Sequence, residues 1–69
     1  MLTIQLKDDY IKLGQALKAA GTVSSGVDAK FMIKEGHVKV NGETEYQRGK
    51  KLYDGDRIEC GGETIQIVK

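Results

Sequence analysis

Residues 24–42, SSGVDAKFMIKEGHVKVNG, carry the clearest structural pattern in the sequence. Ser24 or Ser25 can cap a helix, because a serine oxygen accepts hydrogen bonds from the first free backbone N–H groups. Gly36 stands where that helix must end, in a position that is often left-handed and that glycine adopts at the lowest cost. Asn41-Gly42 is the strongest short hairpin signal that a sequence offers. The stretch therefore predicts a helix, a short strand and a tight turn.

The predicted helix and strand each have an apolar side and a basic or polar side. At about 100° per residue, Ala29, Met32 and Ile33 form one apolar sector of the helix. Val38 and Val40 alternate with polar residues along the strand. If the polar faces of the two elements look the same way, they form a ridge that can bind anions. The residues of this expected ridge are Lys30 and Lys34 on the helix and His37, Lys39 and Asn41 on the strand.

Upstream of this stretch, the sequence predicts a strand and a first helix. Residues 3–7 alternate, with Leu2, Ile4 and Leu6 facing one way. Asp8 or Asp9 is expected to cap a helix that continues to about Ala20 and ends at Gly21. Its apolar stripe is formed by Tyr10, Leu13, Leu17 and Ala20. Gly14 lies inside this helix and predicts close packing against the second helix.

Downstream of Asn41-Gly42, the pattern is that of strands joined by turns. Residues 43–47 are the expected second arm of the hairpin, and residues 54–56, Asp-Gly-Asp, are a turn. Residues 57–60 and 64–68 are two further strands joined by Gly61-Gly62, and Cys60 is expected to be buried. The order β-αα-ββββ is that of an α+β domain, residues 1–69, in which a helix hairpin packs on a small, mainly antiparallel sheet.

The composition is typical of a soluble globular chain. The 69 residues are 39% hydrophobic and 30% charged. No apolar run approaches the roughly 18–20 residues that cross a bilayer, and the first ten residues lack the pattern of a secretory signal. The single cysteine is compatible with a reducing cytosol, and Cys60 with His37 provides too few ligands for zinc. We therefore expect a cytoplasmic monomer without metal, cofactor or membrane partner.

The charge is unevenly distributed along the chain. Residues 12–51 hold eight basic and four acidic residues, whereas residues 52–69 hold two basic and four acidic ones. This asymmetry predicts one basic and one acidic side of the molecule, and a polyanion is the natural partner of the basic side. A solvated charged surface without a partner would have the same composition.

The sequence resembles the S4-type RNA-binding domain family, named after a small-subunit ribosomal protein. The residues that carry the resemblance are Ser25-Gly26, Ala29-Lys30, Ile33, the run from Gly36 to Gly42 (GHVKVNG) and the run from Asp54 to Ile58 (DGDRI). The resemblance covers roughly residues 9–69 and is greatest to small stand-alone bacterial members. Many members carry arginines directly after the serine, where this chain has Gly26 and Val27.

The resemblance implies a non-catalytic domain with an αL RNA-binding motif that contacts structured RNA, such as ribosomal RNA, through the helix hairpin and the following strand. The matching positions put Ser25, Lys30, Lys34, His37, Lys39 and Asn41 at the RNA surface. The ribosome or its assembly intermediates are the implied partners. Lysines that neutralise phosphates, and a surface that reads RNA by shape, are physically consistent with this implication.

Three features leave alternatives open. Phe31 lies away from the apolar sector of its helix and is either a base-stacking platform or a side chain packed against the first helix or a loop. Arg48, Lys50 and Lys51 form either a second phosphate contact or a solvated loop. The chain as a whole could instead be a protein-interaction module that docks an acidic partner through its basic face. The sequence shows no nucleophile–base pair, no set of metal ligands and no phosphate-binding loop that would indicate an enzyme.

Overall fold

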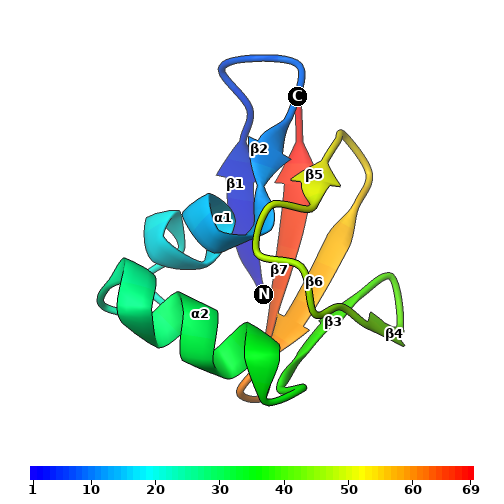
Figure 1. Cartoon of the computed structure of the whole chain (residues 1–69). Helices are drawn as coiled ribbons and strands as arrows, with labels where there is room; N and C mark the ends of the chain where they lie inside the picture. The colour runs from blue at the N-terminus through cyan, green and yellow to red at the C-terminus, as the bar shows by residue number, and fades with distance from the viewer.

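Two helices cover one face of a five-stranded sheet in the computed structural model, which describes residues 1–69 (Figure 1). The elements, in chain order, are β1 (Leu2–Gln5), β2 (Ile11–Lys12), α1 (Leu13–Ala19), α2 (Gly26–Lys34), β3 (Val38–Val40), β4 (Glu43–Thr44), β5 (Lys51–Leu52), β6 (Arg57–Cys60) and β7 (Glu63–Val68). The expected helix hairpin and the later strands are confirmed. Two short strands, β2 and β5, are additions that form a separate pair.

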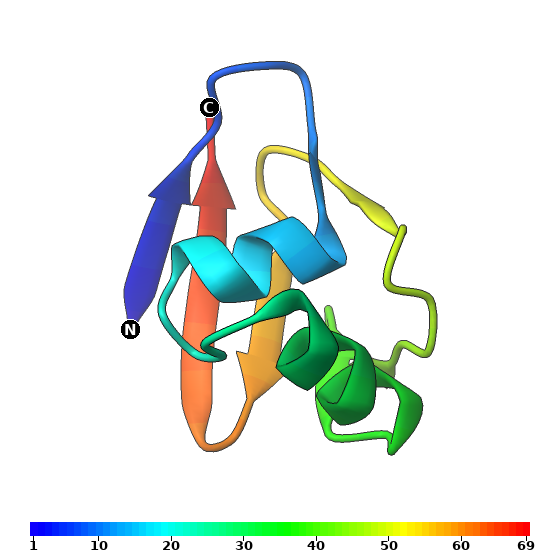
Figure 2. The same ribbon diagram turned by 60° about the vertical axis from the view of Figure 1, so that its left-hand side comes forward.

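The sheet has the strand order β1-β7-β6-β3-β4. β1 pairs with β7 in parallel, and the other neighbours are antiparallel, which confirms a mainly antiparallel sheet (Figure 2). Alternate residues of β3, β6 and β7 are buried. The largest fully buried side chains of the core are Leu13, Leu17, Ile33, Val38, Leu52, Ile58, Cys60, Ile65 and Ile67. The burial of Cys60 is therefore as expected.

Both predicted two-residue hairpin turns are present. Asn41 and Gly42 have φ values of 52° and 85°, and Gly61 and Gly62 have values of 60° and 82°. Two successive left-handed residues match the twist of the flanking strands. The second arm of the first hairpin is shorter than expected, because β4 ends at Thr44. Beyond it, the side chain of Glu45 accepts a hydrogen bond from the N–H of Gln47 (3.1 Å), and the chain leaves the sheet.

α2 begins and ends where the sequence predicts. The Oγ of Ser25 accepts a hydrogen bond from the N–H of Asp28 (3.2 Å), which caps the first turn. Gly36 has φ +80° and terminates the helix. Ala29 and Ile33 are buried against the sheet and Met32 is half-buried, as expected for the apolar sector.

α1 begins later than the sequence predicts. Neither Asp8 nor Asp9 caps it, and the helix starts at Leu13. The N–H groups of Leu13 and Gly14 donate to the carbonyls of Lys50 (2.8 Å) and Arg48 (3.0 Å). These acceptors come from a distant loop, so no local pattern could reveal them. Tyr10 consequently lies outside the helix and is 37% exposed.

Gly14 packs closely against a loop and not against the second helix, so that expectation was wrong. A β-carbon built at Gly14 would lie 2.6 Å from Cγ of Arg48. Any larger residue at this position must displace the arginine side chain.

We predict that Gly14→Ala lowers the free energy of unfolding by about 1 kcal/mol, because overpacking at Arg48 outweighs the better helix propensity of alanine. In an Arg48→Ala background the same substitution should be neutral or stabilising, because the obstruction is gone. Chemical denaturation of the four proteins of this double-mutant cycle measures the coupling. An equal effect of Gly14→Ala in both backgrounds contradicts the packing described here.

Asn41 ties its own turn to the next one. Its backbone N–H donates to the carbonyl of Arg57 (2.8 Å), and its Oδ1 accepts from the N–H of Arg57 (3.0 Å). Its Nδ2 donates to Oδ1 of Asp56 (3.0 Å).

We therefore predict that Asn41→Ala lowers the free energy of unfolding by about 2 kcal/mol, through lost hydrogen bonds and a strained left-handed backbone. Asn41→Gly removes the same side chain but relieves the backbone strain, so it should cost roughly half as much. Urea denaturation of the two variants and the wild type provides the comparison. Wild-type stability in Asn41→Ala would mean that these hydrogen bonds contribute nothing.

Candidate nucleic-acid interface

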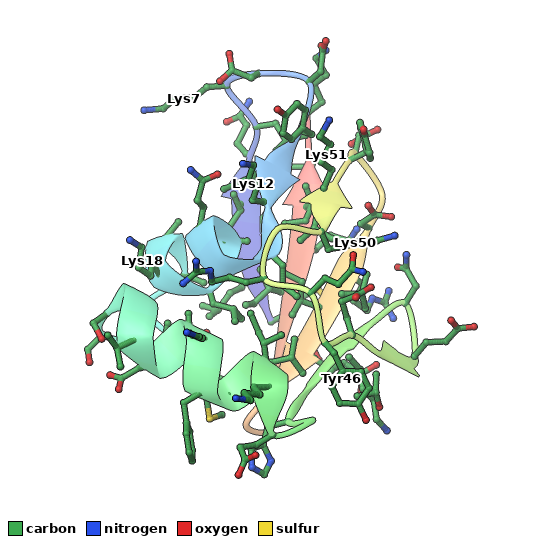
Figure 3. All side chains as sticks on the ribbon, in the orientation of Figure 1. Lys7, Lys12, Lys18, Tyr46, Lys50 and Lys51 are labelled. Atoms are coloured by element: carbon green, nitrogen blue, oxygen red, sulfur yellow. The ribbon has the colours of Figure 1, made fainter.

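A basic hollow lies between α1, the start of α2 and the connection from β4 to β5. Its volume is about 300 Å³. The residues that line it are Lys12, Gly14, Gln15, Lys18, Gly26, Ala29, Arg48 and Gly49. Figure 3 shows Lys12 and Lys18 on the same side of the molecule as Lys50 and Lys51. We call this feature the basic hollow.

The same hydrogen bonds that start α1 position the side chains of the hollow. Because the carbonyls of Arg48 and Lys50 accept from the first N–H groups of α1, the connection is held against the helix. Gln15 accepts a hydrogen bond from the N–H of Lys12 through Oε1 (3.2 Å), which fixes the residue just before the helix. Lys12, Lys18 and Arg48 thus reach one hollow from two distant segments.

The charge in the hollow is positive and unpaired. No carboxylate lines it. The only ion pair within residues 1–69 joins Nζ of Lys69 to Oδ1 of Asp9 at 3.0 Å, so Lys12, Lys18 and Arg48 have no acidic partner. Gly26 and Gly49 have no neighbouring heavy atom where a β-carbon would stand. An anion can therefore approach the backbone closely while three cations attract it.

The expected ridge of five residues is divided in two. Lys30 and Lys34 are exposed on α2, as the helical pattern predicted. Val38 and Val40 face the core, so Lys39 points from the opposite face of the sheet, where its register partner is Glu59. His37 and Lys39 share a hollow of about 240 Å³ with Glu59 and Glu63. This second group is of mixed charge and is not continuous with the lysines of α2.

The polar side chains of Ser25 and Asn41 are already engaged within the protein. Ser25 caps α2, and Asn41 bridges two turns. Phe31 is 59% exposed, so the first helix does not bury it. It borders a shallow hollow beside the connection between the two helices, together with Met32.

Residues 48–51, which we call the basic loop, run from the basic hollow to the β2–β5 pair. Arg48 lines the hollow, whereas Lys50 and Lys51 are exposed further along. The Nζ of Lys51 lies 4.8 Å from the ring centroid of Tyr10. The loop is thus not simply a solvated segment: it completes α1, contributes to the hollow and contacts an aromatic ring.

Sequence reasoning missed three residues of the hollow. Lys12 and Lys18 entered only the charge count, and Gln15 was not considered. The i, i+3 spacing of Gln15 and Lys18 places them on one helix face and was an available signal. Lys12 could not be placed with them, because its position depends on where α1 begins.

Other kinds of site have little support in the structure. No group of three or more His, Cys, Asp and Glu side chains could hold a metal ion. Burial raises the pKa of the Cys60 thiol above its ordinary value, and the charge of Glu63 adds to the effect, so the thiol stays protonated at neutral pH. No helix is long and apolar enough to cross a bilayer.

The chain is similar to known proteins over nearly its whole length. It is 44% identical over 66 residues to RlbA of Bacillus subtilis, whose name provisionally assigns it to ribosome maturation; the match covers 94% of this chain and 93% of RlbA. It is 36% identical over 69 residues to YbcJ of Escherichia coli, provisionally named an RNA-binding protein, with 99% of each chain covered.

The fold of YbcJ has been determined in solution, and its description reports an αL motif involved in RNA binding. That structure matches this one with a TM-score of 0.77 over 100% of this chain and 89% of the other. The family model described as the S4 domain matches residues 4–68. With its helix hairpin, its sheet and this match, the chain belongs to the S4 domain family.

Proposed function

We propose that this protein binds folded RNA without catalysing a reaction, and that the basic hollow is the centre of its RNA interface. The observation that carries the proposal is the convergence of Lys12, Lys18 and Arg48, unpaired, on a hollow without carboxylates. Each lysine or arginine that neutralises an RNA phosphate releases counterions, which favours binding. The name of YbcJ and the RNA-binding motif reported for its solution structure support RNA as the ligand.

The exposed lysines around the hollow extend the proposed interface. Lys30 and Lys34 continue it along α2, and Lys50 and Lys51 continue it toward β5. Phe31 offers an exposed ring on which a base could stack. Ser25, the residue before Gly26 of the hollow, remains a candidate contact although it also caps α2. His37 and Lys39 share a separate hollow of mixed charge and Asn41 bridges two turns, so these three residues lie outside the proposed interface.

The proposed physiological setting is the maturation of ribosomes in the cytoplasm, with ribosomal RNA or an assembly intermediate as the target. Its support is the 44% identity to RlbA. A small domain with lysines around a shallow hollow suits folded RNA, because RNA helices are recognised mostly through shape, phosphates and 2′-hydroxyl groups.

We predict that removing two cations from the hollow weakens RNA binding more than removing two cations elsewhere. The test compares Lys12→Ala/Lys18→Ala with Lys30→Ala/Lys34→Ala and with Lys39→Ala/Arg57→Ala, which all change the net charge equally. Affinity for a folded ribosomal RNA fragment is measured across a salt series. The hollow variant should lose about one to two units of the slope of log K against log salt, because each lost phosphate contact removes about one unit.

Arg48 is left unchanged in this test, because it also packs on Gly14. Lys39 and Arg57 lie on the outer face of the sheet, so their variant is the matched control and should bind nearly as the wild type does. An unaltered slope in the Lys12/Lys18 variant, or the largest loss in the Lys39/Arg57 variant, moves the interface away from the hollow. A single-stranded RNA of equal length serves as the ligand control.

The protein-interaction alternative predicts a different result in the same experiment. If the basic face docks an acidic protein, the wild type should show no preference for folded RNA even at low salt. Absence of RNA binding by the wild type would therefore reject the proposed function and favour that alternative.

A further inference from the structure

A second hollow adjoins the basic one. It lies between β1, the connection from β1 to β2, and α1, and its volume is about 390 Å³. Unlike the basic hollow it is largely apolar. The residues that line it are Ile4, Gln5, Leu6, Lys7, Asp8, Tyr10, Ile11, Gln15 and Ala19. We call it the Tyr10 hollow; Figure 2 shows the connection that forms its upper edge, arching from β1 to β2.

The two hollows share one side chain. Gln15 lines both of them, from the face of α1 that separates them. Its Oε1 accepts a hydrogen bond from the N–H of Lys12, a residue of the basic hollow. A ligand that places an anion in the basic hollow therefore meets an apolar cavity on the other side of Gln15. A nucleotide fits this arrangement, because a charged phosphate is linked through a sugar to a flat base with apolar faces and a polar edge.

The ring of Tyr10 is held in place before any ligand arrives. Its centroid lies 6.0 Å from that of Tyr53, with the rings tilted by 50°. The Nζ of Lys51 lies 4.8 Å from the Tyr10 centroid. Because these contacts restrain the side chain, little rotamer entropy is lost when a ligand packs on it. Tyr10 is still 37% exposed. It was expected on the apolar stripe of the first helix, but it lies outside that helix.

We propose that the Tyr10 hollow binds one unpaired nucleobase of the RNA whose backbone lies in the basic hollow. This inference rests on the proposed function. The aliphatic side chains of Ile4, Leu6 and Ile11 provide an apolar floor, and Tyr10 provides an aromatic wall. The Nε2 of Gln15, whose Oε1 is engaged by the N–H of Lys12, can donate to the edge of a base. A base inside a duplex cannot enter, so the ligand is an RNA with a bulged or single-stranded nucleotide.

The test uses a pair of RNA hairpins that differ in one base. Both carry a single-nucleotide bulge, an adenosine in one and an abasic residue in the other, so the backbone and its charge are the same. We expect the wild type to bind the adenosine bulge about tenfold more tightly, since stacking on an aromatic side chain contributes on this order. Fluorescence anisotropy at fixed salt measures the two affinities.

Two variants locate the preference. Ala19→Met adds a side chain to an exposed position of α1 that lines the hollow, and it should abolish the preference while leaving affinity for the abasic hairpin unchanged. Tyr10→Leu keeps apolar bulk but removes the ring, and it should reduce the preference several-fold. Val27→Met introduces the same residue as the first variant on α2, where Val27 is 77% exposed, outside both hollows, and should retain the preference. Urea denaturation checks that each variant is folded.

The outcomes separate this inference from the function on which it rests. Equal wild-type affinity for the two hairpins, or an unchanged preference in Ala19→Met, overturns the nucleobase site and leaves RNA binding through the basic hollow standing. No binding to either hairpin overturns both. A preference that is lost only in the variants of the Tyr10 hollow supports the site.

Discussion

The beginning of α1 is the contact on which the rest of the structure depends. A helix of seven residues is too short to be stable alone, and its first N–H groups have no acceptor within the helix. The carbonyls of Arg48 and Lys50 provide those acceptors for Leu13 and Gly14. The same two hydrogen bonds bring a cationic side chain beside Lys12 and Lys18. The contact that completes the helix is therefore also the contact that brings the positive charges together. A residue larger than glycine at position 14 would disturb both.

Local patterns predicted the parts of the fold that local interactions determine. The cap at Ser25, the helix end at Gly36 and the two-residue turns depend on residues close in sequence, and all are confirmed. The parts that differ depend on distant partners. Residues 11–12 pair with residues 51–52 instead of continuing a helix, and the hairpin arm after Gly42 is cut short where the chain leaves the sheet toward α1.

The candidate site was predicted in part, for a related reason. The exposure of Lys30 and Lys34 follows from the periodicity of α2 alone. The alternation of β3 alone does not tell on which side of the molecule Lys39 lies relative to Lys30 and Lys34. The packing of both elements in one core does. Because the apolar faces of α2 and β3 both belong to one core, their polar faces point away from that core and not toward a common ridge. The basic hollow required three-dimensional information, since its residues come from α1, α2 and the connection between β4 and β5.

The parallel pairing of β1 with β7 has a consequence for how the protein is made. Residues 2–5 of β1 pair with residues 65–68 of β7, so β1 cannot pair until β7 has been synthesised. β7 also separates β1 from β6, and without it the sheet lacks both the β1–β7 and the β6–β7 ladders. Contacts between such distant segments close slowly, because the entropy of a long loop is lost before they form. β1 therefore cannot join the sheet until residues 63–68 have been synthesised, and the part of the sheet that β1 and β7 form becomes available to the helix hairpin only then.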